Sequence, residues 1–505
     1  MPSPVSPKVV PTEPVTTAMW RDVTDAGVRR RAVARAREVG AWLPRFRDLA
    51  DPASLPAARV AALADVDPDS PHPGNLLRVH WWNDKSRKAQ AKLPAYVELP
   101  RELTGVDARI VVLFGDRFPM IRAHKVLAAY ACLVPRLVTG GFDPTHQRAI
   151  WPSTGNYCRG GVAISRILGC RGVAVLPTGM SAERFEWLSR WVADPADVVR
   201  TPGSESNVKE IYDECARLAK DDANVILNQF SEYANHVGHH SCTGAALAAV
   251  FEALPGTKRC AGFVSATGSA GTIAAGDALK ERYGAKIVAG RGLEGPTPPP
   301  NGFCEHHAAG IGEQHVPLIP HLKNTDVIVG VSDRATNRLG LAFTRPAGHA
   351  YLAERRGVPA AILAQLPSFG YSGIANLLGA IRTARLLDLG REDVVMTVAT
   401  DGAELYASDL DQRERAIAPI GYDQVHAAEA VGEHLTGCAP TQAQELRHED
   451  RLRAFNLGYF TWVEQQGTPL AEFVARRDQA YWRGLRGNVA AWAVVIGEFN
   501  AELER

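Results

Sequence analysis

Between residues 108 and 406, short apolar runs alternate with stretches that have the spacing of amphipathic helices. Short apolar runs bounded by turn residues are typical of buried strands, and strands separated by helices are usually connected in parallel. A parallel sheet needs helices on both faces to bury it. This alternation therefore predicts an α/β fold in which parallel sheets are covered by helices on both faces.

The expected elements follow directly from this pattern. Strands are expected at 110–114, 172–176, 225–227, 262–266, 287–289, 326–331, 360–363 and 394–398. The helices between them include 123–138, 160–168, 244–254 and 373–387.

Helical patterns also lie outside this core. Residues 20–64 carry amphipathic patterns that are broken at Pro56. The segment 423–505 is also typical of helices, and its apolar positions include Trp462, Trp482 and Trp492. Aromatic residues at helical spacing are usually packing residues. We expect both extensions to brace the core or a subunit interface.

The overall charge excludes some partners. The 505 residues include 56 Lys and Arg against 55 Asp and Glu, a net charge of +1. This balance gives no reason to expect a nucleic-acid or membrane partner. No apolar run approaches the length needed to span a bilayer. The Pro-rich first 14 residues are expected to form a flexible tail and not a signal peptide.

The cysteines point to a reducing compartment. Eight Cys are scattered along the chain and none forms a C-x-x-C pair. This distribution favours reduced thiols and a cytoplasmic protein over a disulfide scaffold or a zinc ribbon.

A glycine-rich turn lies in one strand–helix–strand unit, "FVSATGSAGTIAAGDALKERYGAKIV" (263–288). Small residues at a helix N-terminus leave N–H groups free, and the helix dipole favours an anion there, so phosphate is the natural ligand. Neither G-x-G-x-x-G nor G-x-x-x-x-G-K-[ST] fits the turn. From this stretch alone, a turn that merely packs the helix against the sheet is equally compatible.

Three further stretches carry polar groups at helix starts. In "RAHKVLAAYACL", Lys125 begins an otherwise apolar helix, where desolvation would lower the pKa of its amine and suit it to Schiff-base chemistry. In "WPSTGNYCRGG", the Ser153-Thr154-Gly155-Asn156 turn offers donors to a carboxylate. In "PSFGYSGIANLL", Ser372 lies at a strand-to-helix turn. For Lys125 an ordinary solvated lysine remains an alternative, and for each of the last two stretches an ordinary helix cap does.

In this order along the chain, these stretches resemble the tryptophan-synthase-β superfamily of pyridoxal-phosphate (PLP) enzymes, known as fold type II. Within it, the chain is most similar to the cysteine synthase/cystathionine β-synthase family. The resemblance spans residues 99–406 and includes three further segments: "LPTGMSAERFEWL", "NQFSEYANHVGHHSCTGAAL" and "HHAAGIGEQHVPLI".

The resemblance implies two open, twisted, mostly parallel sheets flanked by helices, with helical N- and C-terminal extensions. The expected divisions are an N-terminal tail and helical extension (1–75), a smaller domain with Lys125 and the asparagine loop (76–240), a larger domain with the phosphate loop (241–420), and a C-terminal helical extension (421–505).

The resemblance also implies how a PLP cofactor would be held. Lys125 would form the internal aldimine, Asn156 would hydrogen-bond the phenolic oxygen, and Ser372 would face the pyridine nitrogen. A neutral hydroxyl there is expected to leave that nitrogen largely unprotonated, which favours β-elimination and β-replacement over transamination. The phosphate would be bound by backbone N–H groups and two hydroxyls in the loop Gly268, Ser269, Ala270, Gly271 and Thr272.

For the substrate, the resemblance implies that Ser153, Thr154 and Gly155 bind the carboxylate, with Gln229 nearby. Cysteine synthases have Thr-Gly where this chain continues Tyr157-Cys158-Arg159. We hypothesise that Tyr157 and Arg159 alter the substrate, with cationic Arg159 recruiting a second acidic group. An Arg that faces solvent from the helix start is the alternative.

Other departures concern the cofactor. His124 before Lys125 resembles tryptophan synthase β more than cysteine synthase, and Ala270 stands where the family usually has Gly. Neither a haem-ligating arrangement near the N-terminus nor a paired nucleotide-binding repeat after residue 420 is apparent.

The resemblance implies β-replacement or β-elimination on an amino acid with a β-leaving group, through an aminoacrylate intermediate that a small nucleophile, for example a thiol, can attack. A serine/threonine dehydratase and a non-catalytic binding protein on the same fold are the alternatives. We expect a homodimer, because fold relatives are commonly dimers.

Histidine clusters suggest a competing class, a metallohydrolase. His236 and His240 have the i, i+4 spacing of zinc ligands, but no Glu follows His236 as H-E-x-x-H requires. A second cluster, around Cys304, Glu305, His306, His307 and His315, lies in a Gly-rich stretch. We expect no catalytic metal.

Overall fold

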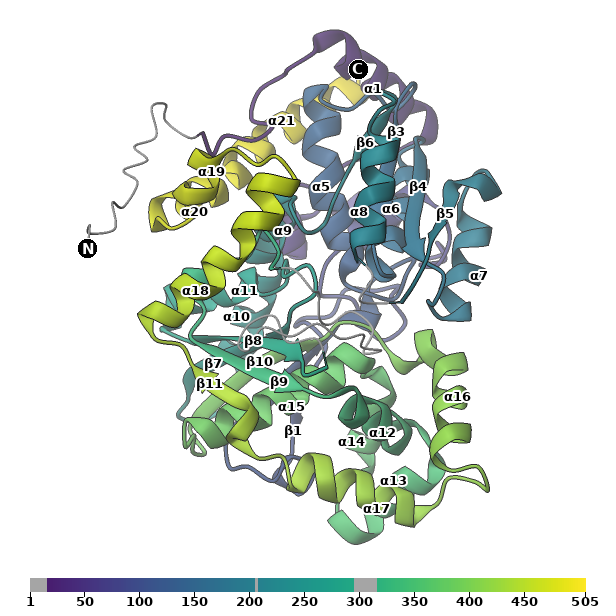
Figure 1. The fold of residues 1–505 in the computed structure, drawn as a ribbon. Coiled ribbons are helices and arrows are strands. Elements are labelled where there is room, and N and C mark those ends of the chain that lie inside the picture. The colour runs from purple at the N-terminus through teal and green to yellow at the C-terminus, as the bar shows by residue number, and fades with distance from the viewer. Residues whose placement is uncertain (1–15, 205–207, 295–315) are drawn as a thin grey trace, which may run out of the picture.

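The fold contains two sheets flanked by helices, as predicted (Figure 1). It is seen in a computed structural model that describes residues 16–204, 208–294 and 316–505. The larger sheet has seven strands and the smaller has four. The segment 304–315, which contains the second histidine cluster, lies outside the described residues.

The larger sheet has the strand order β1-β2-β10-β7-β8-β9-β11. Its inner strands are parallel, and β1 and β11 pair antiparallel at the two edges. The strands are β1 (Tyr96–Leu99), β2 (Arg109–Phe114), β7 (Arg259–Ala266), β8 (Lys286–Gly292), β9 (Val327–Val331), β10 (Asp393–Ala399) and β11 (Ala443–Glu445).

The smaller sheet is entirely parallel, with the order β5-β4-β3-β6. Its strands are β3 (Arg148–Pro152), β4 (Arg171–Pro177), β5 (Val198–Thr201) and β6 (Asn224–Ile226). In its centre, Ile150 pairs with Val173 on one side and with Ile226 on the other.

The chain enters the larger sheet before it builds the smaller one. Strands β1 and β2 pair in the seven-stranded sheet, although the predicted division placed residues 96–114 with the smaller domain. The chain then forms the smaller sheet and returns to the larger one at β7. Strand β11, from the C-terminal extension, also joins the larger sheet, so the sheets do not follow the predicted sequence boundaries.

Helices cover both sheets, as the apolar strands require. Helix α15 (Tyr371–Leu386) packs on β7, β9 and β10, while α11 (Ala274–Tyr283) packs on β7 and β8. On the smaller sheet, α6 (Asn156–Ile167) and α8 (Val208–Leu218) pack against β3 and β4. The remaining helices of the core are α4 (Arg101–Thr104), α5 (Lys125–Thr139), α7 (Ala182–Trp191), α9 (Tyr233–Gly238), α10 (Gly244–Ala253), α12 (Asp333–Thr344), α13 (Pro346–Arg356) and α16 (Ala407–Ile417).

One predicted strand is wrong. Residues 360–363 form the short helix α14 (Ala360–Leu363), which begins directly after Pro359. Alanine has the highest helix propensity, and a proline with its fixed φ suits the start of a helix. The prediction also missed β1, β3, β5 and β11. The other predicted strands overlap observed ones.

Both extensions are helical, as predicted. The N-terminal one contains α1 (Ala26–Val39), α2 (Phe46–Ala50) and α3 (Ala57–Ala61), and α3 begins directly after Pro56. The C-terminal one contains α17 (Gln424–Val431), α18 (His448–Tyr459), α19 (Leu470–Ala475), α20 (Gln479–Arg486) and α21 (Asn488–Leu503).

The two extensions pack together on α5, at the top of Figure 1. Asn500 on α21 donates to the carbonyl of Leu43 (2.8 Å) and accepts from its N–H (3.0 Å). Arg29 on α1 pairs with Glu502 at 2.8 Å. The indole N–H of Trp492 donates to the carbonyl of Met19 at 2.7 Å. Helices α1 and α21 therefore hold α5 from outside.

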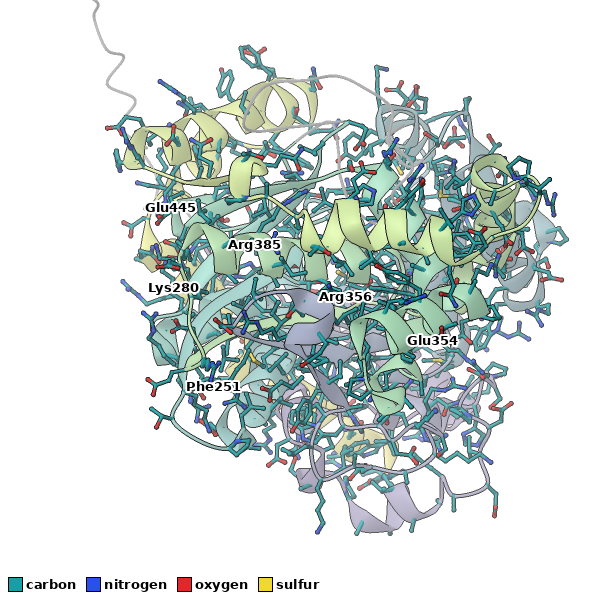
Figure 2. All side chains as sticks on the ribbon, turned by 90° about the horizontal axis from the view of Figure 1, so that it is seen from below. Phe251, Lys280, Glu354, Arg356, Arg385 and Glu445 are labelled. Carbon is teal, nitrogen blue, oxygen red and sulfur yellow. The ribbon has the colours of Figure 1, made fainter. Side chains whose placement is uncertain are left out.

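Ion pairs fasten the other end of the C-terminal extension to the larger sheet. Glu445 on β11 pairs with Lys286 at 2.6 Å, and Arg451 on α18 pairs with Asp326 at 3.0 Å. Asp326 also pairs with Lys280 of α11 at 2.8 Å. Figure 2 shows Lys280 and Glu445 along the same edge of the molecule. Exposed pairs of this kind each contribute little to stability.

Among the described helices, none has the length and apolar character needed to cross a membrane.

The packing of α21 predicts a position-dependent loss of stability. Trp492 is fully buried and its ring lies 5.2 Å from that of Phe46. We expect Trp492→Ala to cost about 3–5 kcal/mol because it leaves a cavity, and so to lower the urea midpoint measured by circular dichroism. Val494→Ala is the control, because Val494 on the same helix is 59% exposed. Equal midpoints for the two variants would contradict the brace.

Candidate active site

A cavity lies between the two sheets, at the carboxyl ends of parallel strands. In open α/β sheets, ligands bind at these ends. The cavity encloses about 730 Å³, part of it open to solvent. Its lining comes from the segments that follow β2, β3, β6, β7 and β10. The predicted site residues among its lining are Lys125, Ser153, Thr154, Asn156, Tyr157, Gln229, Gly268, Ser269, Ala270, Thr272 and Ser372.

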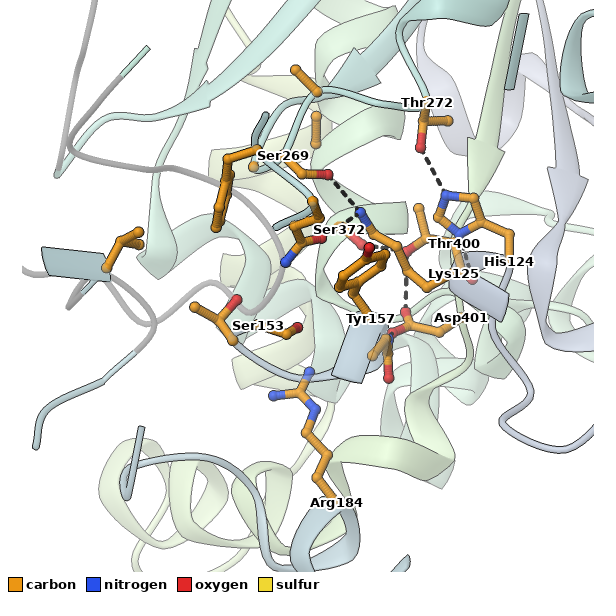
Figure 3. A pocket seen from close by; sticks show the side chains of 18 of the residues that line it. His124, Lys125, Ser153, Tyr157, Arg184, Ser269, Thr272, Ser372, Thr400 and Asp401 are labelled. Atoms are coloured by element: carbon orange, nitrogen blue, oxygen red, sulfur yellow. Dashed lines mark hydrogen bonds between the residues drawn. The ribbon is translucent and has the colours of Figure 1, made fainter. Parts of the chain in front are cut away.

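Lys125 is the first residue of α5, as predicted, and its amine is buried in this cavity. The Nζ atom donates to Ser269 Oγ at 2.8 Å and to Gln229 Oε1 at 3.2 Å (Figure 3). Desolvation lowers the pKa of this amine to about 8. Because a neutral amine is a nucleophile and an ammonium is not, the lowered pKa increases the fraction of the reactive, neutral form of the lysine near neutral pH.

The loop between β7 and α11 offers donors to an anion. In the described part of the chain, no acceptor is found for the backbone N–H groups of residues 268–272. Residues 269–272 are buried, and buried N–H groups are nearly always paired, so these unpaired groups point to a ligand. Ala270 adopts φ +61°, a left-handed conformation that is uncommon outside glycine.

Gly271 is needed because the loop approaches α9 closely. A Cβ at this position would lie 2.2 Å from Asn235 Oδ1. Asn235 is itself buried and donates to the carbonyl of Gln229 at 3.1 Å. Any side chain at residue 271 would therefore displace either the loop or this amide.

His124 lies on the other side of the loop. Its Nδ1 is 3.2 Å from the carbonyl of Thr400 and its Nε2 is 2.8 Å from Thr272 Oγ1. Burial lowers the pKa of the ring to about 3, so the ring is neutral. A carbonyl only accepts, so Nδ1 carries the proton and the Thr272 hydroxyl donates to Nε2. This hydroxyl was expected to donate to phosphate, but here its proton is directed to His124.

The Asn156 amide is fixed on both sides. Its Nδ2 donates to Asp401 Oδ2 at 2.5 Å, and its Oδ1 accepts from Arg159 Nη1 at 2.9 Å. A carboxylate only accepts and a guanidinium only donates, so these partners allow one orientation of the amide. The second N–H of Nδ2 is then the donor left for a ligand in the cavity.

Arg159 does not lie where the acidic-group hypothesis requires. It is buried, it is not among the lining residues of the described chain, and its guanidinium lies 4.9 Å from the ring centroid of Trp187. Burial lowers the pKa of this guanidinium to about 10. The geometry supports neither substrate contact nor solvent exposure; Arg159 orients Asn156 instead. Besides Lys125, the described lining of the cavity includes the guanidinium of Arg184 (Figure 3).

Ser372 begins a short hydrogen-bond chain. Its Oγ is 2.5 Å from Thr400 Oγ1, which donates to Asp401 Oδ1 at 3.3 Å. The Tyr406 hydroxyl also donates to Asp401, at 2.6 Å. Asp401 is fully buried, and this burial raises the pKa of its carboxyl.

The residues expected at the substrate end differ in their exposure to the cavity. Ser153 Oγ accepts from the N–H of Gly155 at 2.9 Å, and Thr154 also lines the cavity. Gly155, at φ +154°, is not itself a lining residue, and a Cβ there would lie 2.8 Å from the Arg184 guanidinium. Tyr157 contributes its ring, because its hydroxyl donates to the carbonyl of Leu227 at 3.0 Å.

Several lining residues were missed from the sequence: Arg184, Val208, Phe230, Ala266, Thr400, Asp401 and Tyr406. Arg184 lies within the "LPTGMSAERFEWL" segment and was available from that resemblance. Thr400 and Asp401 directly follow β10, and a polar pair at the carboxyl end of a parallel strand is the signal that could have indicated them.

The first histidine cluster has a different environment from a metal site. Of the described side chains, no group of three or more His, Cys, Asp or Glu is arranged to hold a metal ion. His236 and His321 pack against Trp482 with ring centroids 4.8 Å away. His239 bonds to Thr243 at 2.8 Å.

These features fit PLP. A buried amine with a lowered pKa, a row of unpaired N–H groups, an oriented amide and a hydroxyl line one cavity, and they correspond to the aldehyde, phosphate, phenol and pyridine nitrogen of that cofactor.

Comparison with known proteins agrees with this chemistry. Residues 96–343 match the sequence model of a family described as "Pyridoxal-phosphate dependent enzyme". Three solved structures show the same fold. The O-acetylserine dependent cystathionine beta-synthase from Helicobacter pylori is 19% identical, with a TM-score of 0.52 over 64% of this chain and 96% of its own.

The second is a hydrogen sulfide-producing enzyme from Fusobacterium nucleatum, which is 20% identical with a TM-score of 0.52 over 66% of this chain and 92% of its own. The third, the cysteine synthase from Entamoeba histolytica, is 20% identical with a TM-score of 0.51 over 67% of this chain and 93% of its own. Residues 96–343 therefore form a pyridoxal-phosphate-dependent enzyme domain with the fold type II architecture.

Proposed function

We propose that this enzyme catalyses β-replacement or β-elimination on an amino acid that carries a leaving group on its β-carbon. The observation that carries the proposal is the buried Lys125 amine. It is hydrogen-bonded to Ser269 of the loop 268–272 and lines the same cavity as Asn156 and Ser372. The names of the structural neighbours, a cysteine synthase and an O-acetylserine dependent cystathionine beta-synthase, support the same reaction class.

The cofactor, when bound, supplies an electron sink that stabilises negative charge on the substrate α-carbon. The protein supplies the proton transfers and the orientation. Lys125 would attach the cofactor, and after the substrate displaces it, its free amine would take the α-proton. Its pKa of about 8 suits both roles, because a general base works best when its pKa is near the working pH.

The remaining residues would hold the cofactor and the carboxylate of the substrate. The N–H groups of residues 268–272 would bind phosphate, the free N–H of Asn156 would bind the phenolic oxygen, and Ser372 would face the ring nitrogen. Ser153, Thr154 and the backbone at Gly155 would bind the substrate carboxylate, with Gln229 beside Lys125. Arg184 would add positive charge at the substrate end.

We further propose a cytoplasmic homodimer. Seven cysteines in the described chain are buried and unpaired, which suits a reducing compartment. The dimer is proposed because enzymes of this fold commonly form one, and sedimentation velocity would test it.

The reaction class is tested by a substrate panel. With O-acetylserine or O-phosphoserine, we expect pyruvate and ammonia to be released in the absence of a thiol and a thioether to form when a thiol is added. Mass spectrometry detects both outcomes. Release of 2-oxobutyrate from threonine, without thioether formation from any donor, would instead indicate a dehydratase.

Lys125 should be the only attachment point of the cofactor. After borohydride reduction of the PLP-loaded protein, peptide mapping should find a pyridoxyl group on Lys125. Lys125→Ala should lose this adduct and turnover together. Lys209→Ala is the control, because Lys209 lies on the exposed face of α8. An adduct elsewhere, or none, would refute the assignment.

The lowered pKa of Lys125 predicts how cofactor attachment depends on pH. Below about pH 8 the amine is mainly protonated, so the rate of attachment to the apoprotein should rise about tenfold per pH unit and level off above the pKa. Stopped-flow absorbance measures this rate. A rise that continues to about pH 10 would show that the amine is not desolvated.

The close approach at Gly271 predicts a loss of cofactor affinity. Gly271→Ala should displace the loop from Asn235 and weaken PLP binding by about tenfold or more, equivalent to about 1.4 kcal/mol. Fluorescence titration of the apoprotein gives the dissociation constant. The control is Gly497→Ala, since nothing lies within 4 Å of a Cβ there. Equal affinities would show that the loop does not bind phosphate.

A further inference from the structure

A second cavity lies beside the active-site cavity and has no role in the proposed function. The two cavities share Arg184 and Tyr406 in their linings, so these side chains form a common wall. The second cavity encloses about 680 Å³, part of it open to solvent. It is bounded by the loop that follows β4, the first turn of α7 and the first half of α16, at the right of Figure 1.

Arg184 connects this wall to the substrate end of the active site (Figure 3). It is buried, and its Nη2 donates to the Tyr406 hydroxyl at 3.1 Å. It also lies against Gly155 of the loop that is proposed to bind the substrate carboxylate, because a Cβ on Gly155 would lie 2.8 Å from the guanidinium carbon. Arg184 therefore lies between the second cavity and the substrate end.

The second cavity has an excess of positive charge. Among its described lining residues, the charged ones are Arg184, Arg413 and Asp409. Asp409 pairs with Arg413 at 3.4 Å, so its carboxylate compensates one of the two guanidinium groups. The carboxylate of Glu183 is not part of the lining and accepts from the N–H and the hydroxyl of Ser408. A partly enclosed cavity with one uncompensated positive charge favours a monoanion.

Arg413 is well suited to receive that anion. Its Nε is buried and has no hydrogen-bond partner in the part of the chain that the structure describes. A guanidinium has five N–H donors and can bind a carboxylate through two parallel hydrogen bonds. Because buried polar groups are nearly always paired, this donor is available to a ligand in the cavity that Arg413 lines.

The charges on α16 lie outside the part of the chain that matches the family. The family model ends at residue 343, whereas Asp409 and Arg413 belong to α16 (Ala407–Ile417). This helix therefore adds charged groups next to the active site that the family match does not describe.

We propose that the second cavity binds the carboxylate of the acceptor, the small nucleophile that attacks the β-carbon in the proposed reaction. Arg413 binds this carboxylate, and Arg184 contributes a second positive charge on the side nearer the active site. The inference rests on the proposed function and names the class of acceptor. A thiol that carries a carboxylate is preferred over a neutral thiol, since only the carboxylate forms a charge-assisted pair with a guanidinium.

A binding experiment isolates the second cavity. Borohydride reduction of the PLP-loaded protein fixes the cofactor on Lys125, so the active site is occupied and no reaction follows. The probe is 3-(methylthio)propionate, whose sulfur is blocked and whose carboxylate is free. Isothermal titration calorimetry should show binding of the probe, and binding about tenfold weaker or more for its methyl ester. Arg413→Gln should cause a similar loss with the free acid.

Arg415→Gln is the matched control. Arg415 lies on the same helix, is exposed, and is absent from the described linings of both cavities, so this variant should bind the probe as the wild type does. Gln412→Glu is a second variant, because Gln412 is exposed and lines the second cavity. It adds a negative charge there and should weaken binding of the probe. The urea midpoint of each variant shows whether its structure is kept.

Acceptor kinetics test the same site during turnover. With O-acetylserine as the donor, 3-mercaptopropionate and 2-mercaptoethanol are compared as acceptors in the wild type and in Arg413→Gln. The ratio of variant to wild type is taken for each thiol, so differences in intrinsic reactivity cancel. The KM for 3-mercaptopropionate should rise about tenfold or more. The KM values for 2-mercaptoethanol and for O-acetylserine should stay unchanged.

The outcomes separate the two proposals. If borohydride leaves no adduct on Lys125, the proposed function fails, and this inference fails with it. If the adduct forms but the reduced enzyme does not bind the probe, or binds it equally well after Arg413→Gln, only the carboxylate site is refuted. An equal rise in KM for both thiols would also refute it, because Arg413 would then act through the fold and not through the carboxylate.

Discussion

The chemistry proposed for this enzyme depends on the removal of one ammonium group from water. Lys125 is the first residue of α5, the helix that follows β2 of the larger sheet, and its amine is hydrogen-bonded to Ser269 and Gln229. Desolvation disfavours the charge and lowers the pKa of the amine to about 8, so more of it is neutral and nucleophilic near neutral pH than for an exposed lysine. The two sheets, the small-residue loop and the outer helices all contribute to keeping that position dry and fixed.

The sequence was sufficient for the parts of the site that are local. A lysine at the start of an apolar helix, a glycine-rich turn before α11 and a polar turn before α6 are each readable within a few residues, and each lies at the cavity. The parallel strands were likewise visible as apolar runs. The strand predicted at 360–363 failed because four apolar residues after Pro359 fit a short helix equally well.

What could not be read depends on packing between distant segments. Arg159, between a cysteine and two glycines, gives no sign that it will be buried against Trp187 and bonded to Asn156. Asp401 lies 245 residues after Asn156 in the sequence, so nothing in its local sequence shows that it orients that amide. Long-range polar contacts of this kind are set by the folded sheets and not by spacing along the chain.

The pairing of the two extensions also has a consequence for biosynthesis. Domains generally begin to fold in order as the ribosome delivers them. Helix α5, which carries Lys125, is made early, but its outer partner α21 is among the last segments to emerge. The outer face of α5 therefore stays uncovered in the nascent chain until α21 has been synthesised. Chaperones that bind exposed apolar surfaces can act on the chain during this interval.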